Sequence, residues 1–541
     1  MKSKILYFLG LFVLAFLISL PLILPYFKQG FFPTHDGEWA VVRLSDMYRE
    51  IKDLQFPARF SGYLNFQYGY PLFNFAYPLP YYFGLIFVFL KMGFVGSIKI
   101  LFSLSVIFSF ISMYLLSSNF WKNKWAGLIS GIFYLYVPYR IVDLYVRGSI
   151  GESLSFVLFP LILLGIKKIY ESKDLKYFFA TSAFFALLVA THNIMTVLFG
   201  LIIFLIVVVS LLYKKFNFVF RLFGSLVFSM CLSAFFWIPA IFEKNLILLS
   251  KIPIADRNLY FVKPLDLVIP KWGYGTPTDP NGFGYQLGIP QLLALGFVIS
   301  FFILKFKKES QRKVLSFLII STLVISFLMF SASSILWHLP LLSEINYPWT
   351  VLSILIFLVA LIVGYLGKLG KKFTILAIIL SLSAVVFVLP HAVPNYQVER
   401  GDGFYVTNQA TTTSSNELMP LWVKVFPLSA PSSKVVAKGN ISNLKSKSNS
   451  ISFNVLLERN ETVTINTIYY PGWEFKVDGR NAKINYNNRH GVMEINVSKG
   501  NHLVQGRLME TPLRMTADFI SFAAIFTLIF YAIYSYFKKM K

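Results

Sequence analysis

Long apolar runs separated by short polar loops dominate the chain up to about residue 390. A helix rises 1.5 Å per residue, so crossing the hydrocarbon core of a bilayer takes about 20 predominantly apolar residues. The sequence contains about a dozen runs of roughly this length. The loops between them are rich in Lys and Arg, for example at residues 167–168, 214–215 and 371–372. This pattern predicts a polytopic α-helical membrane protein with about 12 to 13 membrane segments.

The first and last apolar runs predict the orientation of the chain. Residues 5–27 are too long for the core of a signal peptide and no small-residue cleavage site follows, so we expect a retained helix. The last run, residues 517–537, ends in Lys-Lys-Met-Lys. Cations accumulate on the cytoplasmic side of a membrane, which places both termini there. Residues 28–78 and 391–512 then lie outside a multi-pass cell-membrane protein, in the extracellular or periplasmic space.

Two segments leave the number of crossings open. Residues 177–212 are too long for one crossing, and we expect Thr191-His192-Asn193 to break them into two short helices. Residues 78–94 are short and contain both proline and glycine, which favours a re-entrant or interfacial helix. The alternative is one long crossing through 191–193, which would move residues 143–152 to the inside.

The pattern changes at His391. Beyond this residue Val, Ile, Thr and Asn alternate, which is the period of a half-buried strand. Strands are expected at 452–457, 462–470, 473–477 and 492–497, with turns at Asp478-Gly479 and Lys499-Gly500-Asn501. We therefore predict a membrane domain at 1–390, an exterior β-sandwich at 391–512, and a final transmembrane helix with a basic cytoplasmic tail at 513–541.

The composition excludes a water-soluble enzyme. Of 541 residues, 56% are hydrophobic and only 14% are charged, which is far outside the soluble globular range. In a soluble chain, the formal charge of +25 would suggest nucleic-acid binding. Most of these cations lie in short loops between apolar runs, so we expect membrane lipids and no nucleic acid as partners.

Ionisable residues gather in the first exterior loop. His35, Asp36 and Glu38 follow the first helix directly, and the apolar positions after them predict a helix on the membrane surface. A carboxylate at the mouth of a cavity between helices suits a general base. Asp is also a favoured N-cap residue, so Asp36 could serve only to begin this helix. The three side chains could also hold a divalent cation, but their spacing is a weak metal signal.

A second group of ionisable residues lies further along the chain. Asp143, Arg147 and Glu152 flank the start of a predicted helix. Ionisable groups at this depth are either functional or paired with one another, and the sequence favours neither interpretation. His192 interrupts an apolar run, where hydration of two short helix ends is a sufficient explanation.

Several motifs along the chain resemble one family of membrane proteins. The resemblance includes His35-Asp36, Arg43, Phe56-Pro57, Arg59, Tyr68-Gly69-Tyr70-Pro71 and Pro78-Leu79-Pro80-Tyr81-Tyr82, and it continues at 145–152, 191–193, 347–349 and 469–474. This pattern is similar to the 6-pyruvoyl-tetrahydropterin synthase-related membrane proteins, close to the YfhO-like proteins. Tyr347 stands where the family usually has Phe. The sequence gives no sign of a soluble pterin enzyme.

This resemblance implies a GT-C membrane glycosyltransferase, a hexosyl or pentosyl transferase of the cell envelope. Such enzymes take a sugar from a polyprenyl-phosphate donor and keep an acidic residue in the first exterior loop. The implied partners are a lipid-linked sugar donor and an acceptor glycan, lipid or protein that the sequence does not identify. Asp36 would be the general base, with His35 and Glu38 as helpers or metal ligands, and direct attack on the donor would invert the anomeric carbon.

The resemblance also implies residues that bind the donor phosphate. A guanidinium group matches phosphate geometry, so Arg43, Arg59, Arg140 and Arg147 are the candidates, with Asp143, Glu152 and His192 as a second group of site residues. No cofactor is indicated other than the divalent cation that the first loop could hold.

Two other function classes stay open. A transporter or flippase for a lipid or envelope polymer would place ionisable residues at the midplane of paired repeats. Here such residues gather in exterior loops and no internal repeat is visible. A non-catalytic envelope assembly protein would use its β domain to hold partners. The concentration of His, Asp, Glu and Arg between residues 35 and 59 favours the enzyme.

Overall fold

The chain folds into two compact units, each made from three stretches of sequence. The computed structural model describes residues 2–305 and 309–540. The first unit comprises Met1–Glu38, Val95–Met230 and Ala255–Gly401. The second comprises Trp39–Phe94, Cys231–Ile254 and Asp402–Lys541.

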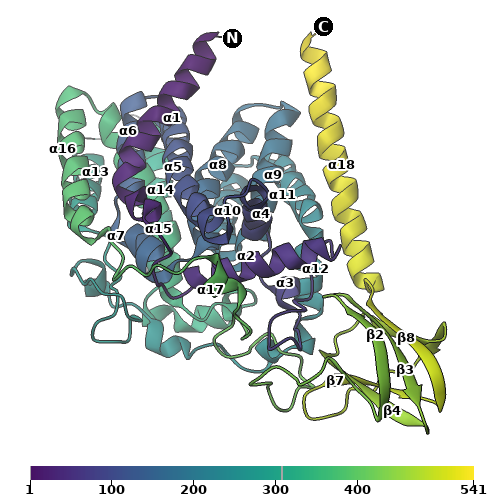
Figure 1. Cartoon of the computed structure of the whole chain (residues 1–541). Coiled ribbons are helices and arrows are strands. Elements are labelled where there is room, and N and C mark those ends of the chain that lie inside the picture. Colours follow the sequence, from purple (N-terminus) through teal and green to yellow (C-terminus); the bar gives the residue numbers. More distant parts are fainter. Residues whose placement is uncertain (1, 306–308, 541) are drawn as a thin grey trace. The chain divides into compact units, whose positions relative to one another are not determined.

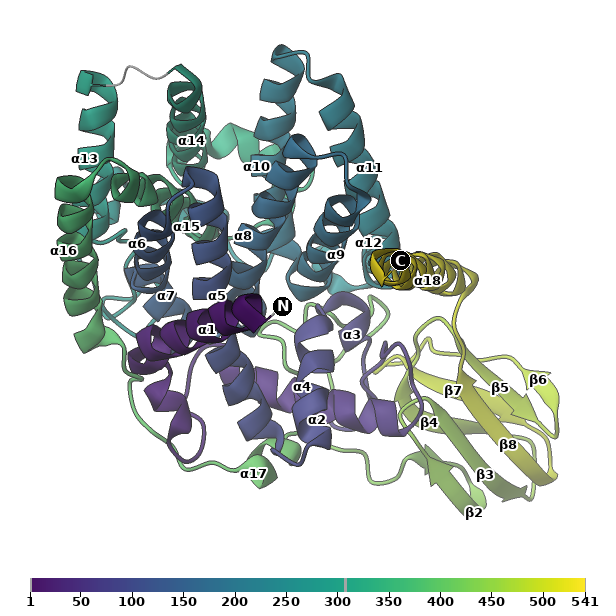
Figure 2. The ribbon, with the colours of Figure 1, turned by 90° about the horizontal axis from the view of Figure 1, so that it is seen from above.

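The first unit is a bundle of apolar helices (Figure 1). Its helices are α1 (Lys2–Ile23), α5 (Phe94–Trp121), α6 (Lys124–Leu135), α7 (Pro138–Val142), α8 (Ile150–Glu171), α9 (Leu175–Thr191), α10 (Asn193–Leu212), α11 (Phe216–Leu232), α13 (Ile289–Lys305), α14 (Glu309–Phe327), α15 (Leu352–Val363) and α16 (Lys371–Val388). Every residue of α15 is buried, as expected of a helix that is apolar on all sides. It contacts α6, α8, α10, α13 and α14, and is the central helix of the unit (Figure 2).

The described helices confirm a polytopic membrane protein. Seven of them are long and apolar enough to cross a membrane, and the number is ten if each of three bent helix pairs forms one span. Three shorter apolar helices are α4, α9 and α13. The expected total of about 12 to 13 segments, and the side of the membrane on which each loop lies, stay predictions.

The structure shows the local conformation of the two ambiguous segments, while the re-entrant or interfacial placement of 78–94 stays a prediction. Helix α9 ends at Thr191, His192 has an extended backbone with φ −164° and ψ 116°, and α10 begins at Asn193. The expected break is therefore confirmed. The segment 78–94 contains α4 (Leu79–Phe89), whose 11 residues span about 16 Å. This is about half of the hydrocarbon core, so α4 by itself is too short for a simple crossing.

The second unit joins short helices, the final long helix and all described strands. Its helices are α2 (Gly37–Lys52), which begins in the first unit, α3 (Leu72–Phe75), α4, α12 (Ala234–Phe242), α17 (Asp402–Val406) and α18 (Pro512–Met540). Helix α18 packs against α12. On α18, Arg514 donates to both carboxylate oxygens of Glu243, at 2.9 and 2.8 Å. This buried pair ties the last helix to the segment that follows α12.

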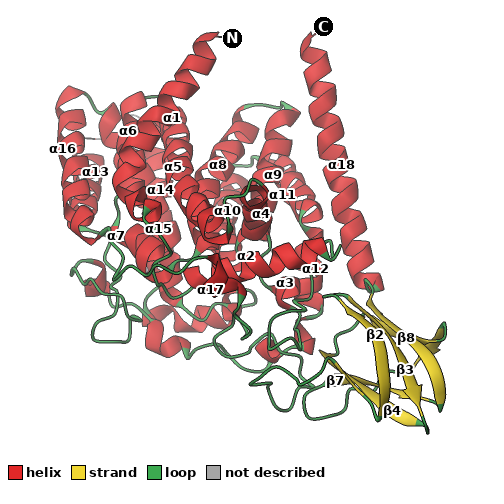
Figure 3. Ribbon diagram, viewed as in Figure 1, coloured by secondary structure: helices red, strands yellow, loops and turns green. Residues whose placement is uncertain are grey.

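The strands form two antiparallel sheets (Figure 3). They are β1 (Val435–Val436), β2 (Gly439–Ser446), β3 (Ser450–Leu457), β4 (Glu461–Ile468), β5 (Trp473–Val477), β6 (Arg480–Ala482), β7 (Val492–Val497) and β8 (Gly500–Leu508). One sheet has the order β1-β4-β7 and the other β2-β3-β8-β5-β6. The predicted β-rich domain is confirmed, and β5 and β7 have the expected bounds. Face-to-face packing as a sandwich and the domain boundaries at 390 and 512 stay predictions.

The two predicted turns of the β domain have different roles. Asp478 and Gly479 have φ values of 49° and 80° and join β5 to β6 as a two-residue hairpin, as expected for Asp-Gly. Lys499-Gly500, in contrast, carries the chain from β7 in the three-stranded sheet to β8 in the five-stranded sheet. A local turn signal marks a reversal of the chain but does not show which strands pair.

Candidate active site

The loop that carries His35 and Asp36 is fixed by its backbone to the turn that carries Arg147. The His35 N–H donates to the Val146 carbonyl at 2.9 Å, and the Asp36 N–H donates to the Arg147 carbonyl at 2.7 Å. Residues Asp143–Arg147 form a π-helical turn, an arrangement that is frequent at functional sites. Asp36 is therefore held beside Arg147 by main-chain bonds that need no particular side chain.

Gly148 allows this close approach. It has φ 64°, a conformation that glycine adopts without strain. A Cβ atom built on Gly148 would lie 2.2 Å from Thr34 Oγ1 and 2.8 Å from the Gly37 nitrogen. Glycine at position 148 therefore allows the loop that carries Asp36 to pack against the turn that carries Arg147.

Asp36 is an exposed residue. Its carboxylate accepts no hydrogen bond from the described part of the chain, and the nearby Arg147 guanidinium interacts with its charge. The N–H of Gly37 at the start of α2 donates to Thr34 Oγ1 at 2.8 Å, and the Asp36 side chain makes no N-cap hydrogen bond to a described residue, although Asp36 directly precedes α2. A carboxylate without an internal partner is available to accept a proton.

The other two first-loop candidates have partners. His35 Nε2 lies 2.9 Å from the Tyr274 carbonyl oxygen, and Arg400 Nη1 donates to Glu38 Oε1 at 3.2 Å. Within residues 2–305 and 309–540, no three His, Cys, Asp or Glu side chains are grouped so that they could hold a metal ion. The divalent cation stays a prediction from the sequence.

The Arg147 guanidinium has one hydrogen-bonded nitrogen, Nη1, and a free edge formed by Nε and Nη2. Its Nη1 donates to the Tyr139 hydroxyl at 3.1 Å and also to Glu152 Oε2. Its Cζ lies 4.8 Å from the centre of the Trp349 ring, so the guanidinium is stacked on the indole. Nε and Nη2 make no hydrogen bond to any described residue, and the side chain is 13% exposed. Arg147 can therefore still donate to an anion with the geometry that suits phosphate.

Glu152 is buried and positions Arg147. Besides the Arg147 contact, its Oε1 accepts hydrogen bonds from the Tyr139 hydroxyl at 2.8 Å and from Ser353 Oγ at 2.5 Å. Ser353 belongs to the central helix α15, so Glu152 connects the site to the core of the first unit. His192 interacts electrostatically with Glu152 and caps α10 by accepting the Met195 N–H at 3.4 Å. The structure thus brings Arg147, Glu152 and His192 together.

Arg140 and Asp143 form a separate buried pair. Arg140 Nη1 lies 3.2 Å from Asp143 Oδ2, and Arg140 Nη2 donates to Ser105 Oγ at 3.3 Å. The carboxylate of Asp143 also accepts a bond from Ser153 Oγ at 2.5 Å. Both side chains are almost fully buried. The sequence left open whether Asp143, Arg147 and Glu152 pair with one another; in the structure Glu152 pairs with Arg147, whereas Asp143 pairs with Arg140.

Arg43 and Arg59 belong to the second unit, where their nitrogen atoms all have partners. Arg43 donates to Thr412 Oγ1 at 2.9 Å, to the Thr412 carbonyl at 2.5 Å and to the Tyr81 hydroxyl at 3.5 Å. Arg59 donates to Glu510 at 3.3 Å, to the Phe235 carbonyl at 2.5 Å and to Asp518 at 2.6 Å. Among the four candidate arginines, Arg147 is the one that combines exposure with nitrogen atoms that have no partner in the described chain.

The family match covers most of this site but not the first loop. The model of the 6-pyruvoyl-tetrahydropterin synthase related domain, described as a membrane protein, matches residues 73–393. The chain belongs to this family. The matched range of this 6-pyruvoyl-tetrahydropterin synthase-related protein includes Arg147, Glu152 and His192, whereas His35 and Asp36 precede it. The resemblance inferred from the sequence is therefore confirmed. No curated protein matches the sequence.

Two solved structures have a partial likeness to this family member. One is the arabinofuranosyltransferase AftD from Mycobacteria, with a TM-score of 0.47 and 14% identity over 73% of this chain and 28% of that chain. The other is the Archaeoglobus fulgidus oligosaccharyltransferase, with a TM-score of 0.41 and 15% identity over 74% of this chain and 56% of that chain. The chain thus corresponds to less than two thirds of either protein.

Sequence reasoning about this family member gave no role to Trp349. Its ring centre lies 5.3 Å from that of Phe283 and 5.6 Å from that of Tyr347, so an aromatic cluster surrounds the residue on which Arg147 stacks. The motif Tyr347-Pro348-Trp349 contributed to the family resemblance, and its aromatic residues at a helix start were the available signal. The distance of about 200 residues to Arg147 in the sequence concealed the contact.

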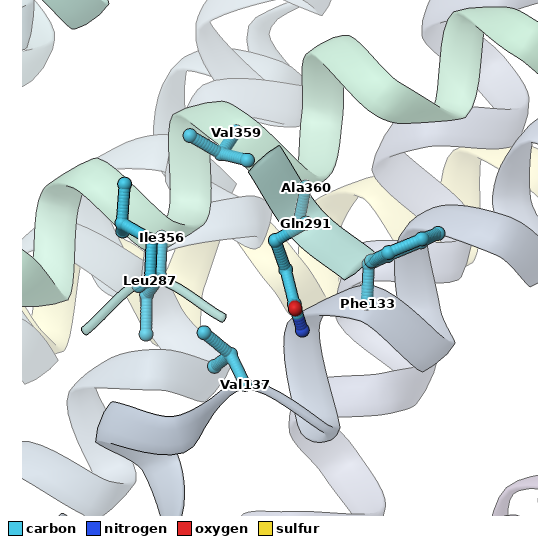
Figure 4. A pocket seen from close by; sticks show the side chains of 7 residues that line it. All are labelled: Phe133, Val137, Leu287, Gln291, Ile356, Val359 and Ala360. Carbon is cyan, nitrogen blue, oxygen red and sulfur yellow. The ribbon is translucent and has the colours of Figure 1, made fainter. Parts of the chain in front are cut away.

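A small apolar cavity lies elsewhere in the first unit. It is lined by Phe133, Val137, Leu287, Gln291, Ile356, Val359 and Ala360 (Figure 4). Gln291 Nε2 donates to the Tyr136 carbonyl at 2.6 Å, while its Oε1 has no partner in the described chain. None of the lining residues is a candidate from the sequence, so the proposed chemistry does not involve this cavity.

Proposed function

We propose that this protein is a GT-C membrane glycosyltransferase that moves a sugar from a polyprenyl-phosphate donor to an acceptor on the outer face of the membrane. The observation that carries the proposal is the pairing of Asp36 and Arg147. Asp36 is exposed, and its carboxylate has no hydrogen-bond partner among the described residues. Its backbone N–H donates to the Arg147 carbonyl at 2.7 Å, and the Nε and Nη2 groups of Arg147 are available to a ligand. A base and an anion-binding group are the two parts that this transfer needs.

The proposed reaction is a single displacement. Asp36 accepts the proton of the acceptor hydroxyl as its oxygen attacks the anomeric carbon of the donor sugar. The bond from that carbon to the phosphate oxygen breaks, and polyprenyl phosphate leaves with the electron pair. Because phosphate is a good leaving group, no strong general acid is required. Attack from the opposite face inverts the anomeric configuration.

Arg147 stabilises the negative charge that the phosphate gains in the transition state. Glu152, Tyr139 and Trp349 hold the guanidinium before the substrate arrives, so little reorganisation is needed during the reaction. Glu152 also compensates the buried positive charge while leaving Nε and Nη2 available. We assign Asp36 and Arg147 to direct contact with the substrates and Glu152 to positioning.

A transporter or flippase is the second candidate, favoured by the charges buried among the helices. Arg140 with Asp143 and Arg147 with Glu152 are ionisable pairs of the kind that line transport pathways in membrane proteins. The two functions differ in their products. A transferase releases polyprenyl phosphate, whereas a transporter moves an unchanged lipid across the bilayer.

The test measures release of polyprenyl phosphate from a panel of polyprenyl-phosphate sugars by the purified full-length protein. Asp36→Asn should lower turnover by about 100-fold or more, since general-base catalysis contributes about 10²- to 10⁴-fold. The control is Glu458→Gln, which removes an exposed carboxylate of the β domain. Equal turnover in Asp36→Asn and wild type would remove Asp36 from the mechanism. Movement of intact donor across vesicles without release would favour the transporter.

A further inference from the structure

The indole N–H of Trp349 is a buried donor without an acceptor. Trp349 is 4% exposed, and its Nε1 has no hydrogen-bond partner among the described residues. Leaving a buried donor unsatisfied is costly, and a buried Trp N–H usually finds a partner. Trp337 provides the ordinary case, since its buried indole N–H donates to the Leu328 carbonyl at 3.0 Å. The missing acceptor of Trp349 therefore needs an explanation.

The unsatisfied N–H belongs to the same indole on which the Arg147 guanidinium stacks. Arg147 Cζ is 4.8 Å from the centre of the Trp349 ring, and the indole nitrogen belongs to that ring. Donors to a phosphate group lie about 2.7–3.0 Å from its oxygens. An anion held beside this stacked pair of side chains would accept from the indole N–H with one oxygen and from the guanidinium with another. Within the described chain, neither the indole N–H nor the Nε and Nη2 groups of Arg147 have an acceptor.

We propose that Trp349 Nε1 and the free edge of Arg147 form one phosphate-binding site, which holds the phosphate of the lipid-linked donor. This inference rests on the proposed function for the source of the phosphate. It adds Trp349 as a residue that contacts the substrate. In this site the indole of Trp349 has two roles. Its face orients the Arg147 guanidinium, and its N–H binds the phosphate that Arg147 also binds.

The indole of Trp349 is buried among aromatic rings, so an anion reaches its N–H only if neighbouring groups move. Phe283 and Tyr285 lie against the indole, with ring centres at 5.3 and 6.3 Å. Both belong to the irregular segment between residue 267 and the start of α13, and loop segments move more readily than helices. A phosphate group that enters the site displaces these rings and supplies the acceptor that the indole lacks.

The test follows the indole N–H signals of the full-length protein labelled with ¹⁵N-tryptophan. Farnesyl phosphate is the lipid probe, inorganic phosphate is the headgroup alone, and farnesol is the chain alone. The Trp349 signal, assigned with Trp349→Phe, should move downfield with both phosphates and stay in place with farnesol. The Trp337 signal is the internal control, because its N–H already has an acceptor. A shift with inorganic phosphate alone would indicate a site for free phosphate and would overturn the donor assignment.

A binding measurement complements the spectrum. Trp349→Phe keeps an aromatic face for Arg147 but removes the N–H, so its affinity for farnesyl phosphate should fall about tenfold, as for one lost charge-assisted hydrogen bond. Trp337→Phe should bind as wild type does. If Trp349→Phe does not fold, Trp349→Tyr supplies the assignment of the signal, and the wild-type spectrum then decides. A Trp349 signal that stays in place while farnesyl phosphate binds would overturn the inference.

The two proposals fail in different ways. Turnover of a polyprenyl-phosphate sugar together with an unresponsive Trp349 signal would leave the transferase standing and remove Trp349 from the phosphate site. A Trp349 shift with farnesyl phosphate but no turnover of any donor would keep the phosphate site and contradict the transferase.

Discussion

Replacing Gly148 with alanine should damage the site without unfolding the protein. The new Cβ would lie 2.2 Å from Thr34 Oγ1 and 2.8 Å from the Gly37 nitrogen, whereas ordinary contact begins at 3.4 Å. Rotation of the Thr34 side chain can relieve the first contact. The second involves backbone, so the Asp36 loop must retreat from the Arg147 turn by about 0.6 Å or more. Misplacement of a catalytic group by about 1 Å can cost about 100-fold in rate.

The expected result is a fall in turnover of about 10- to 100-fold, with a loss of stability of about 1–2 kcal/mol from alanine at positive φ. Polyprenyl-phosphate release and thermal unfolding of the purified protein measure the two quantities. Gly479→Ala is the matched control, because Gly479 has φ 80° but no atom within 4 Å of a Cβ. It should lose stability but not activity. If both variants retain full turnover, the packing of Gly148 against the first loop does not position Asp36.

Three further predictions concern buried charges. Glu152→Gln keeps acceptors for Tyr139 and Ser353 but loses the charge that pairs with Arg147, so the KM for the donor should rise; an unchanged KM would exclude the positioning role. Arg514→Met should cost about 3–5 kcal/mol by leaving the buried Glu243 carboxylate unpaired, and a denaturant titration should show recovery in the Arg514→Met/Glu243→Leu double variant. Burial raises the pKa of Asp46 to about 6, so the folded state favours the protonated carboxyl. The stability that this proton contributes is fully present below the unfolded pKa of about 4 and is lost as pH rises through about 6. Unfolding midpoints measured from pH 4 to 7 should decline less steeply in Asp46→Asn, and parallel curves for the two proteins would contradict this.

In the structure, most of the candidate residues named from the sequence form ion pairs or hydrogen-bond networks. Asp36, Arg147, Glu152 and His192 come together in the first unit, and the sequence had placed all four in exterior loops or at helix ends. It could not separate Arg147 from Arg59, because that distinction depends on partners such as Asp518, which is 459 residues away. Hydrogen-bond saturation of a guanidinium group is a property of the folded chain.

The sequence by itself determined the elements whose signals are local. Apolar runs of membrane length, the polar break at His192, and the alternation that defines β5 and β7 are read within about 5 to 20 consecutive residues. The family resemblance is likewise carried by short motifs. Each of these features depends on neighbours along the chain, so the order of amino acids is sufficient to predict it.

Tertiary structure alone decided which groups are available for chemistry. The backbone bonds that place Asp36 beside Arg147 join residues about 110 positions apart, and the stacking of Arg147 on Trp349 joins residues about 200 positions apart. Burial and the choice of hydrogen-bond partner follow from packing between distant segments. The sequence therefore listed the ionisable and aromatic residues, and the fold determined that Arg147 keeps a free edge and that Trp349 keeps a donor without an acceptor.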